Sequence, residues 1–160
     1  MKTLVLIRHA DTLVKQLGQM DWERPLSKHG ISQAQNFGHT LQSQNIYPGW
    51  VVCSHALRAQ ATALRILNAC GVIDAYVQTD KSLYLGFVED YWSVLQNLPE
   101  EQSTVLVIGH NPTLSAIIGD IMGEINISIQ PCCGVILQPL TDSWSRCRHH
   151  VWRITTLTTD

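Results

Sequence analysis

Short apolar runs alternate with longer amphipathic segments along most of the chain. Four runs are short and nearly continuous, as in the strands of a parallel sheet that is covered on both faces. They lie at 2–7, 50–53, 75–78 and 104–108. Because the segments between them carry apolar residues at helical spacing, the pattern predicts strands that alternate with helices.

The amphipathic segments predict four helices, at 27–44, 56–70, 88–98 and 113–122. Ser27 is placed to cap the first helix, and Gly71 is placed to end the second. In the second helix, apolar spacing predicts a buried face made by Leu57, Ala61, Leu64 and Leu67. Helices of this length are long enough to connect parallel strands.

The end of the chain has a different pattern. Residues 134–140 and 151–157 alternate between apolar and polar side chains around a polar connection, which predicts an antiparallel hairpin. The expected fold class is therefore α/β: a three-layer α/β/α sandwich with a mostly parallel central sheet and a C-terminal antiparallel hairpin. At 160 residues, we expect a single domain that spans 1–160.

Composition narrows the classes of partner and compartment. The net charge of −2 gives no support for nucleic acid or an acidic membrane surface as a partner. Arg8 and His9 stop the apolar opening run, and no later run approaches the ~20 apolar residues that cross a bilayer. We therefore expect a cytoplasmic protein with no membrane partner, and the sequence leaves its oligomeric state open.

Five cysteines are present, and none lies in a Cys-x-x-Cys pair. This spacing predicts neither a zinc site nor a disulfide framework. We expect reduced, mostly buried thiols, no metal and no cofactor.

Basic and imidazole side chains follow three of the predicted strands. Arg8 and His9 end the first, Arg58 lies in the first helical turn after the second, and His110 follows the fourth. Open α/β sheets bind ligands at the carboxyl ends of their strands, so these groups are expected in one crevice. An imidazole can attack phosphorus, and two guanidinium groups can hold phosphoryl oxygens. The arrangement predicts a phosphatase.

Four short motifs occur in order: Arg8-His9-Ala10, Arg24-Pro25-Leu26-Ser27-x-x-Gly30, Ser54-x-x-Leu57-Arg58-Ala59-x-x-Thr62 and Gly109-His110-Asn111-Pro112. From residue 2 to about residue 120, the chain resembles the histidine phosphatase superfamily, and most closely its short SixA-type phosphohistidine phosphatases. The resemblance implies a phosphoglycerate mutase-like fold in which His9 is the nucleophile and carries the phosphoryl group transiently. It also implies that Arg8 and Arg58 clamp the phosphoryl oxygens and that His110 completes the pocket.

The resemblance also has a gap. Mutase-like and acid-phosphatase members of the superfamily carry a carboxylic acid after the third strand, where this chain reads Ser82-Leu83-Tyr84-Leu85-Gly86. The usual general acid is therefore expected to be absent. An alkoxide leaving group needs a proton, whereas a phosphoramidate nitrogen can be protonated before its bond breaks. This favours phosphohistidine of a signalling protein, such as a histidine-containing phosphotransfer domain, as the substrate.

Other interpretations stay open. If Asp11, Glu89 or Asp90 supplies the proton, the chain would be a phosphatase for small phosphate esters. The alternative roles are loop capping for Asp11 and a favourable interaction with the helix dipole for the other two. His55 lies beside the end of the second strand, where it either contacts the phosphate or starts the helix. A third hypothesis is a phosphate-binding regulator without turnover.

Overall fold

The computed structural model describes residues 1–157, and six strands in this part of the chain form one sheet in the order β3-β2-β4-β1-β5-β6. The strands are β1 (Thr3–Arg8), β2 (Trp50–Ser54), β3 (Tyr76–Asp80), β4 (Thr104–Gly109), β5 (Gly134–Pro139) and β6 (Trp152–Leu157). The helices are α1 (Lys28–Ser43), α2 (Leu57–Cys70), α3 (Ser82–Leu85), α4 (Val88–Gln96) and α5 (Thr113–Met122). Two 3-10 turns lie at Asp21–Glu23 and Cys147–His149.

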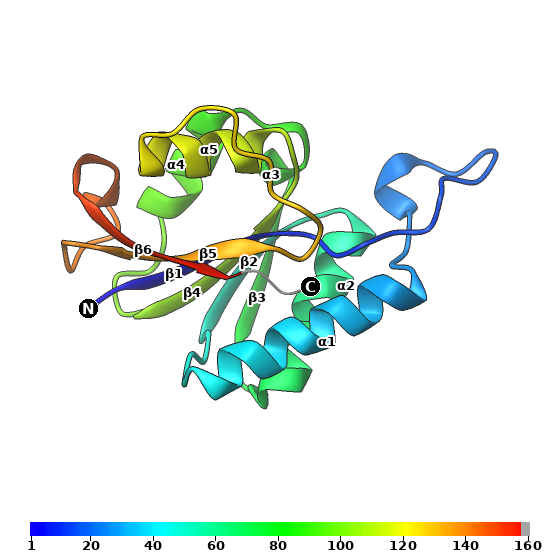
Figure 1. Ribbon diagram of the computed structural model, residues 1–160, viewed down its shortest axis with the longest axis horizontal. Coiled ribbons are helices and arrows are strands. Elements are labelled where there is room, and N and C mark those ends of the chain that lie inside the picture. The colour runs from blue at the N-terminus through cyan, green and yellow to red at the C-terminus, as the bar shows by residue number, and fades with distance from the viewer. Residues whose placement is uncertain (158–160) are drawn as a thin grey trace.

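The sheet confirms the predicted fold class. Strands β3, β2, β4 and β1 pair in parallel, whereas β5 pairs antiparallel with both β1 and β6. Figure 1 shows α1 and α2 on one face of the sheet and α3, α4 and α5 on the other. The helices that connect parallel strands therefore cover both faces, which is why these strands are almost continuously apolar.

Each face of the sheet has its own hydrophobic core, and β1 contributes to both. Val5 and Ile7 belong to the core under α1 and α2, whereas Leu4 and Leu6 belong to the core under α4 and α5. Successive side chains of a strand point to opposite faces, so an unbroken apolar run satisfies both layers. This fixes the direction in which β1 leaves the sheet at Arg8.

The predicted buried face of α2 is correct at Leu67 and wrong at two other leucines. Leu57 is 46% exposed and Leu64 is 55% exposed. The buried residues of α2 are Arg58, Ala59, Thr62, Ala63, Ile66, Leu67 and Cys70. Small side chains allow the helix to approach α1 closely, where a Cβ atom on Gly38 would lie 2.5 Å from the Ile66 carbonyl oxygen. Close packing against α1 therefore selects the face of α2 with small side chains, and this face carries Arg58 inward.

The ends of the helices follow local capping chemistry. The Ser27 hydroxyl accepts a hydrogen bond from Gly30 N, and Gly71 ends α2 in the left-handed region at φ 77°. The predicted C-terminal end of α4 was two residues too late, and the short helix α3 was not predicted. No helix within residues 1–157 has the length and apolar character needed to span a bilayer.

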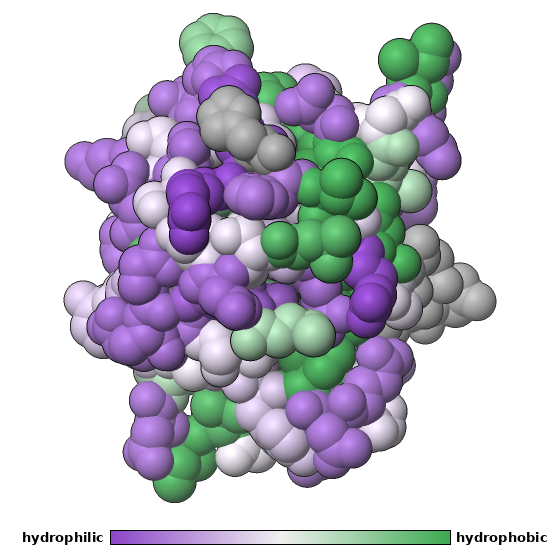
Figure 2. Space-filling view, turned by 90° about the vertical axis from the view of Figure 1, so that its left-hand side faces the viewer, coloured by the Kyte–Doolittle hydropathy of each residue, from purple (hydrophilic) through white to green (hydrophobic). Residues whose placement is uncertain are grey.

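The two ends of the sheet differ in character. Figure 2 shows the end that carries the N-terminus, where hydrophilic side chains predominate beside a strip of hydrophobic ones. In Figure 1 the loop from β1 to α1 projects at the opposite end, where β1 delivers its carboxyl end. The two arginines and two histidines predicted for the site, Arg8, His9, Arg58 and His110, lie at that second end.

Candidate active site

Two adjacent strands place the two imidazoles side by side. The parallel register pairs Arg8 of β1 with Gly109 of β4, so His9 and His110 follow at equivalent positions. Their ring centroids are 4.8 Å apart. Both side chains are buried, His9 at 9% and His110 at 6% exposure.

The first turn of α2 adds a guanidinium to this pair. Arg58 Nε donates to His9 Nε2 at 3.3 Å, and Arg58 Nη2 lies 3.4 Å from His110 Nδ1. Thr62 Oγ1 accepts a hydrogen bond from Ala10 N at 3.1 Å and donates to the Arg58 carbonyl at 2.7 Å. One hydroxyl thereby ties the start of α2 to the chain that follows His9.

The tautomer of His9 is set by its own neighbour. His9 Nδ1 lies 2.8 Å from the Ala10 carbonyl oxygen, which can only accept, so Nδ1 carries the proton and Nε2 keeps a lone pair. Burial lowers the pKa of His9 to about 4, and the Arg58 and Arg8 charges act in the same direction against the Ala10 hydrogen bond. At neutral pH the ring is therefore uncharged, which is the form of an imidazole that can attack phosphorus.

His110 is held through its backbone. Its N–H donates to Tyr91 Oη at 3.0 Å, and that hydroxyl donates to the Leu83 carbonyl at 3.2 Å. Burial lowers the pKa of His110 to about 3, with His9 and Arg58 adding to the effect. Within the described residues its buried Nε2 has no hydrogen-bond partner. A neutral ring whose Nδ1 faces Arg58 presents an Nε2–H donor to the pocket.

Arg8 is fixed by the loop that precedes β5. Its Nη1 donates to the Ile129 carbonyl at 3.1 Å, and Asn111 Nδ2 donates to the same oxygen at 2.8 Å. Burial and the nearby Arg58 charge lower the pKa of Arg8. Its buried Nε has no hydrogen-bond partner among the described residues. Arg8 thus retains donor capacity for an anion.

These groups line one concavity of about 300 Å³. Its lining residues are Arg8, His9, Thr12, Asp21, Arg24, Arg58, Tyr84, Leu85, His110 and Asn111. All four residues predicted for the site, two arginines and two histidines, therefore share one pocket. Cationic forks and imidazoles that face a small polar hollow are suited to a tetrahedral oxyanion.

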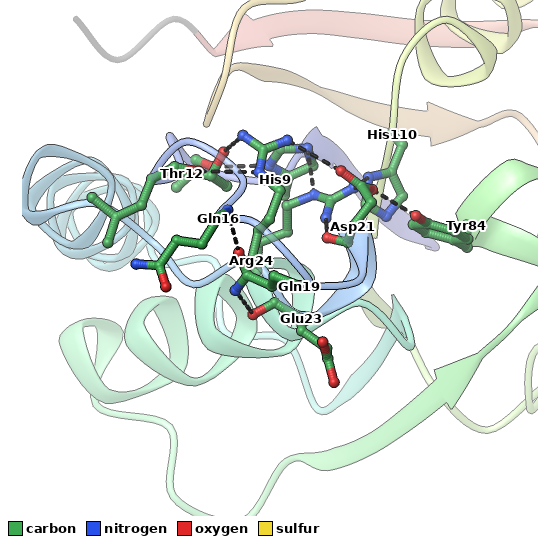
Figure 3. Close-up of polar contacts among 12 residues, drawn as sticks. His9, Thr12, Gln16, Gln19, Asp21, Glu23, Arg24, Tyr84 and His110 are labelled. Atoms are coloured by element: carbon green, nitrogen blue, oxygen red, sulfur yellow. Dashed lines mark hydrogen bonds and ion pairs between the residues drawn. The ribbon is translucent and has the colours of Figure 1, made fainter.

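An unpredicted carboxylate lies in this pocket. Asp21 Oδ2 accepts from Tyr84 Oη at 2.5 Å and from Arg58 Nη2 at 2.9 Å, and Oδ1 accepts from Arg24 Nη1 at 3.2 Å. Figure 3 shows the side chains of Tyr84 and Arg24 on either side of Asp21. The hydrogen bond from Tyr84, followed by those from Arg58 and Arg24, holds the pKa of this carboxyl well below its usual range. The group is thus an anion, not a proton donor.

Comparison with known proteins decides the family. The model of the histidine phosphatase superfamily (branch 1) matches residues 4–84. The chain belongs to this superfamily. Membership of this superfamily and a pocket suited to an oxyanion together support a phosphatase.

Solved structures place this histidine phosphatase among SixA-type folds. A protein assigned as the phosphohistidine phosphatase SixA of Nakamurella multipartitia superposes with a TM-score of 0.81 at 27% identity, covering 96% of this chain and 93% of that one. The protein histidine phosphatase SixA in complex with tungstate superposes with a TM-score of 0.80 at 20% identity, covering 96% and 94%.

The chain is also similar to curated proteins of other organisms. An uncharacterized protein of Mycobacterium tuberculosis is 32% identical over 111 residues, which cover 69% of this chain and 66% of the relative. The chain spans about two thirds of the length of the curated relatives that it matches.

The three acids that the sequence offered as proton donors lie outside the pocket of this histidine phosphatase. Asp11 Oδ2 accepts from the Ser27 hydroxyl at 2.5 Å. Glu89 binds Arg148 through both oxygens, and Asp90 accepts from Phe87 N at 2.7 Å at the start of α4. Asp11 and Asp90 thus make the local contacts that their alternative roles predict, whereas Glu89 forms an ion pair with Arg148, which lies 59 positions away.

His55 lies behind the pocket wall and not among its lining residues. Its ring meets Tyr84 edge-on at a centroid distance of 5.0 Å and lies 6.3 Å from Trp22. Its Nδ1 is buried without a hydrogen-bond partner within the described chain. The structure therefore places His55 beside the pocket residue Tyr84 but not among the residues that line the pocket.

Sequence reasoning missed Asp21 and Tyr84 as pocket residues. Tyr84 was taken as part of a neutral segment, and Asp21 was not singled out in its loop. One signal was present: Asp21 precedes Arg24 by three residues, a spacing at which a 3-10 turn brings two side chains together. This pair forms an ion pair at 3.2 Å.

Proposed function

We propose that this histidine phosphatase removes the phosphoryl group from phosphohistidine of a protein through a phosphorylated His9 intermediate. The observation that carries the proposal is the state of His9, whose Nδ1 is held by the Ala10 carbonyl while Nε2 faces Arg58. A neutral imidazole with one free nitrogen is the form that attacks phosphorus.

The first step joins His9 Nε2 to phosphorus and breaks the P–N bond to the substrate imidazole, which takes the electron pair. Arg8, Arg58 and the Nε2–H of His110 are placed to hold the three phosphoryl oxygens as charge spreads over them. In the second step water attacks phosphorus, the bond to His9 breaks, and inorganic phosphate leaves.

The acid–base chemistry of the pocket supports a phosphoramidate substrate. The Asp21 carboxyl is ionised, and the Tyr84 hydroxyl donates to Asp21 while its own pKa is raised by burial and by that carboxylate. Neither is suited to protonate an alkoxide. A phosphorylated imidazole does not need such a donor, because its nitrogen can be protonated before bond cleavage.

The opening of the pocket supports a macromolecular substrate. The catalytic imidazoles are buried, but the lining residue Leu85 is 81% exposed. The site therefore reaches the surface within a few side chains of the nucleophile. A phosphohistidine on a helical phosphotransfer domain would be presented at such a surface.

The test compares wild type with His9→Ala on a phosphohistidine peptide. Wild type should release phosphate and acquire an acid-labile, base-stable phosphoryl label, and His9→Ala should do neither. His29→Ala is the matched control, because His29 is exposed on α1. Hydrolysis that survives in His9→Ala would contradict the assigned nucleophile. Wild type that binds tungstate but turns over no phosphorylated substrate would instead favour a phosphate-binding regulator.

A further inference from the structure

Asp21 is an anion in a pocket built for an anion. Tyr84, Arg58 and Arg24 each donate to it, so its carboxylate has a fixed position and orientation. A negative charge beside the phosphoryl position weakens the binding of phosphate alone, because like charges repel. A role in phosphate affinity therefore does not explain this carboxylate.

Holding Arg58 does not fully explain Asp21 either. Arg58 Nη1 already donates to the backbone carbonyl of Asp21 at 2.7 Å, and its Nε is bound to His9 at 3.3 Å. A neutral side chain at position 21 would retain both contacts. The carboxylate adds a charge to a guanidinium whose plane these two bonds already orient.

The depth of the carboxylate shows which part of a ligand it meets. The Arg58 side chain is 7% exposed, whereas the Asp21 side chain is 41% exposed. Asp21 thus lies between the buried arginine and the opening, at the level where the leaving group enters. The phosphoryl oxygens would lie deeper, against the two imidazoles and Arg58.

Phosphohistidine carries a positive charge at that level. When the phosphorylated ring is protonated it is an imidazolium, and cleavage of the P–N bond gives it the electron pair and leaves it neutral. His9 keeps its Nδ1 proton while Nε2 bonds to phosphorus, so the positive charge passes from the leaving ring to the His9 ring. The leaving group of a phosphate ester carries no positive charge that could lie beside Asp21.

We propose that the Asp21 carboxylate selects substrates whose leaving group is a cation attached to the phosphoryl group. The inference rests on the proposed function, because it assigns the basis on which that site prefers phosphohistidine to phosphate esters. Asp21 is a specificity residue that faces the leaving group, and Tyr84 and Arg24 hold it there.

Two small substrates isolate the charge of the leaving group. One is N-phosphorylated 4-dimethylaminopyridine, whose leaving group carries a positive charge as long as it is bonded to phosphorus and departs as a neutral amine. The other is p-nitrophenyl phosphate, whose leaving group is uncharged while it is bonded and departs as a phenolate. Neither requires a proton for departure. In Asp21→Asn, the ratio of kcat/KM for the cationic to the aryl substrate should fall about tenfold or more, which corresponds to one charge contact in a partly screened site.

Three further variants and a ligand define the outcome. Glu23→Gln removes a carboxylate charge two residues from Asp21. Glu23 lies outside the pocket, where it accepts a hydrogen bond from Met20 N, so this variant should leave the ratio unchanged. Asp21→Ala should lower the ratio as much as Asp21→Asn, and Asp21→Glu should restore part of it. Tungstate affinity of Asp21→Asn should be equal or tighter, because an anion has left the pocket.

Equal losses on both substrates, with weaker tungstate binding, would overturn the inference and reduce Asp21 to a support for Arg58. Failure of the proposed function gives a different result. Wild type would then be inactive on a phosphohistidine peptide, while the ratio for the two small substrates would still depend on Asp21.

Discussion

At the scale of single residues, the state of the His9 ring, the proposed nucleophile, depends on one adjacent backbone group. The adjacent Ala10 carbonyl fixes the proton on His9, so the reactive nitrogen is defined as soon as β1 ends in its native direction. Arg58 and burial then keep the ring uncharged. His110 reaches the same uncharged state by burial beside His9 and Arg58.

These buried imidazoles predict a pH-dependent stability. An unfolded histidine titrates near 6.5, whereas His9 and His110 titrate at about 4 and about 3 in the folded protein. As pH falls below 6.5 the unfolded chain binds protons that the folded protein does not, so the free energy of unfolding decreases. Each imidazole should contribute a loss of about 2 kcal/mol between pH 7.5 and pH 5.

Urea unfolding at these two pH values, in a buffer free of phosphate, measures the effect. The pH-dependent loss should be about 2 kcal/mol smaller in His110→Asn than in wild type. His39→Asn lies outside the pocket and serves as a control. A loss of wild-type size in His110→Asn would show that His110 is not held neutral.

At the scale of elements, strand ends and helix starts position the chemistry, and Tyr91 of α4 connects them. Its hydroxyl receives the His110 N–H, and its ring packs against Gly109 at the end of β4. A Cβ atom on Gly109 would lie 2.0 Å from Tyr91 Oη. The absence of a side chain at 109 is therefore what lets α4 support the backbone of His110.

Gly109→Ala should consequently damage the site. Tyr91 must move, and its hydrogen bond to His110 is lost with it, so we expect a loss of about 1–3 kcal/mol in stability and a lower kcat. Gly49→Ala is the matched control, because its nearest contact is the flexible end of Gln102 at 3.0 Å. Urea unfolding and phosphate release provide the two readouts. A fully active Gly109→Ala would show that Tyr91 is dispensable for placing His110.

The sequence predicted what depends on regular elements. Apolar runs located the strands, and residues at strand ends converge in any open parallel sheet, so Arg8, His9, Arg58 and His110 were found together. The Tyr84–Asp21 contact joins residues 63 positions apart, and no period in the sequence encodes such a pairing. The face of α2 was mispredicted because it also depends on a contact between distant segments. Close packing of α2 against Gly38 of α1 favours small residues over large ones.

At the scale of the whole molecule, the hydrophobic core under α4 and α5 is covered by Trp144 at the end of the sheet far from the pocket. Trp144, in the connection from β5 to β6, is fully buried, and its Nε1 donates to the Gln102 carbonyl at 2.9 Å. Glu100 Oε2 accepts from Trp144 N at 2.9 Å. The hairpin connection is thereby fastened to the segment that leads into β4.

Trp144→Ala should therefore weaken the fold without altering the chemistry. Loss of this buried ring should lower the free energy of unfolding by about 3–5 kcal/mol. Because the ring lies at the other end of the sheet, kcat measured well below the melting temperature should match wild type. Thermal unfolding and phosphate release measure the two effects. A large fall in kcat with intact stability would contradict this separation.

The distance between the two imidazoles follows from the sheet itself. Neighbouring strands are spaced by about 4.8 Å through their hydrogen bonds, and the rings of His9 and His110, which directly follow the paired ends of β1 and β4, have centroids 4.8 Å apart. The hydrogen bonds between β1 and β4 thus set the spacing of the His9 and His110 backbones. Helices and loops around the sheet could be exchanged, in evolution or by engineering, while that spacing stayed constant.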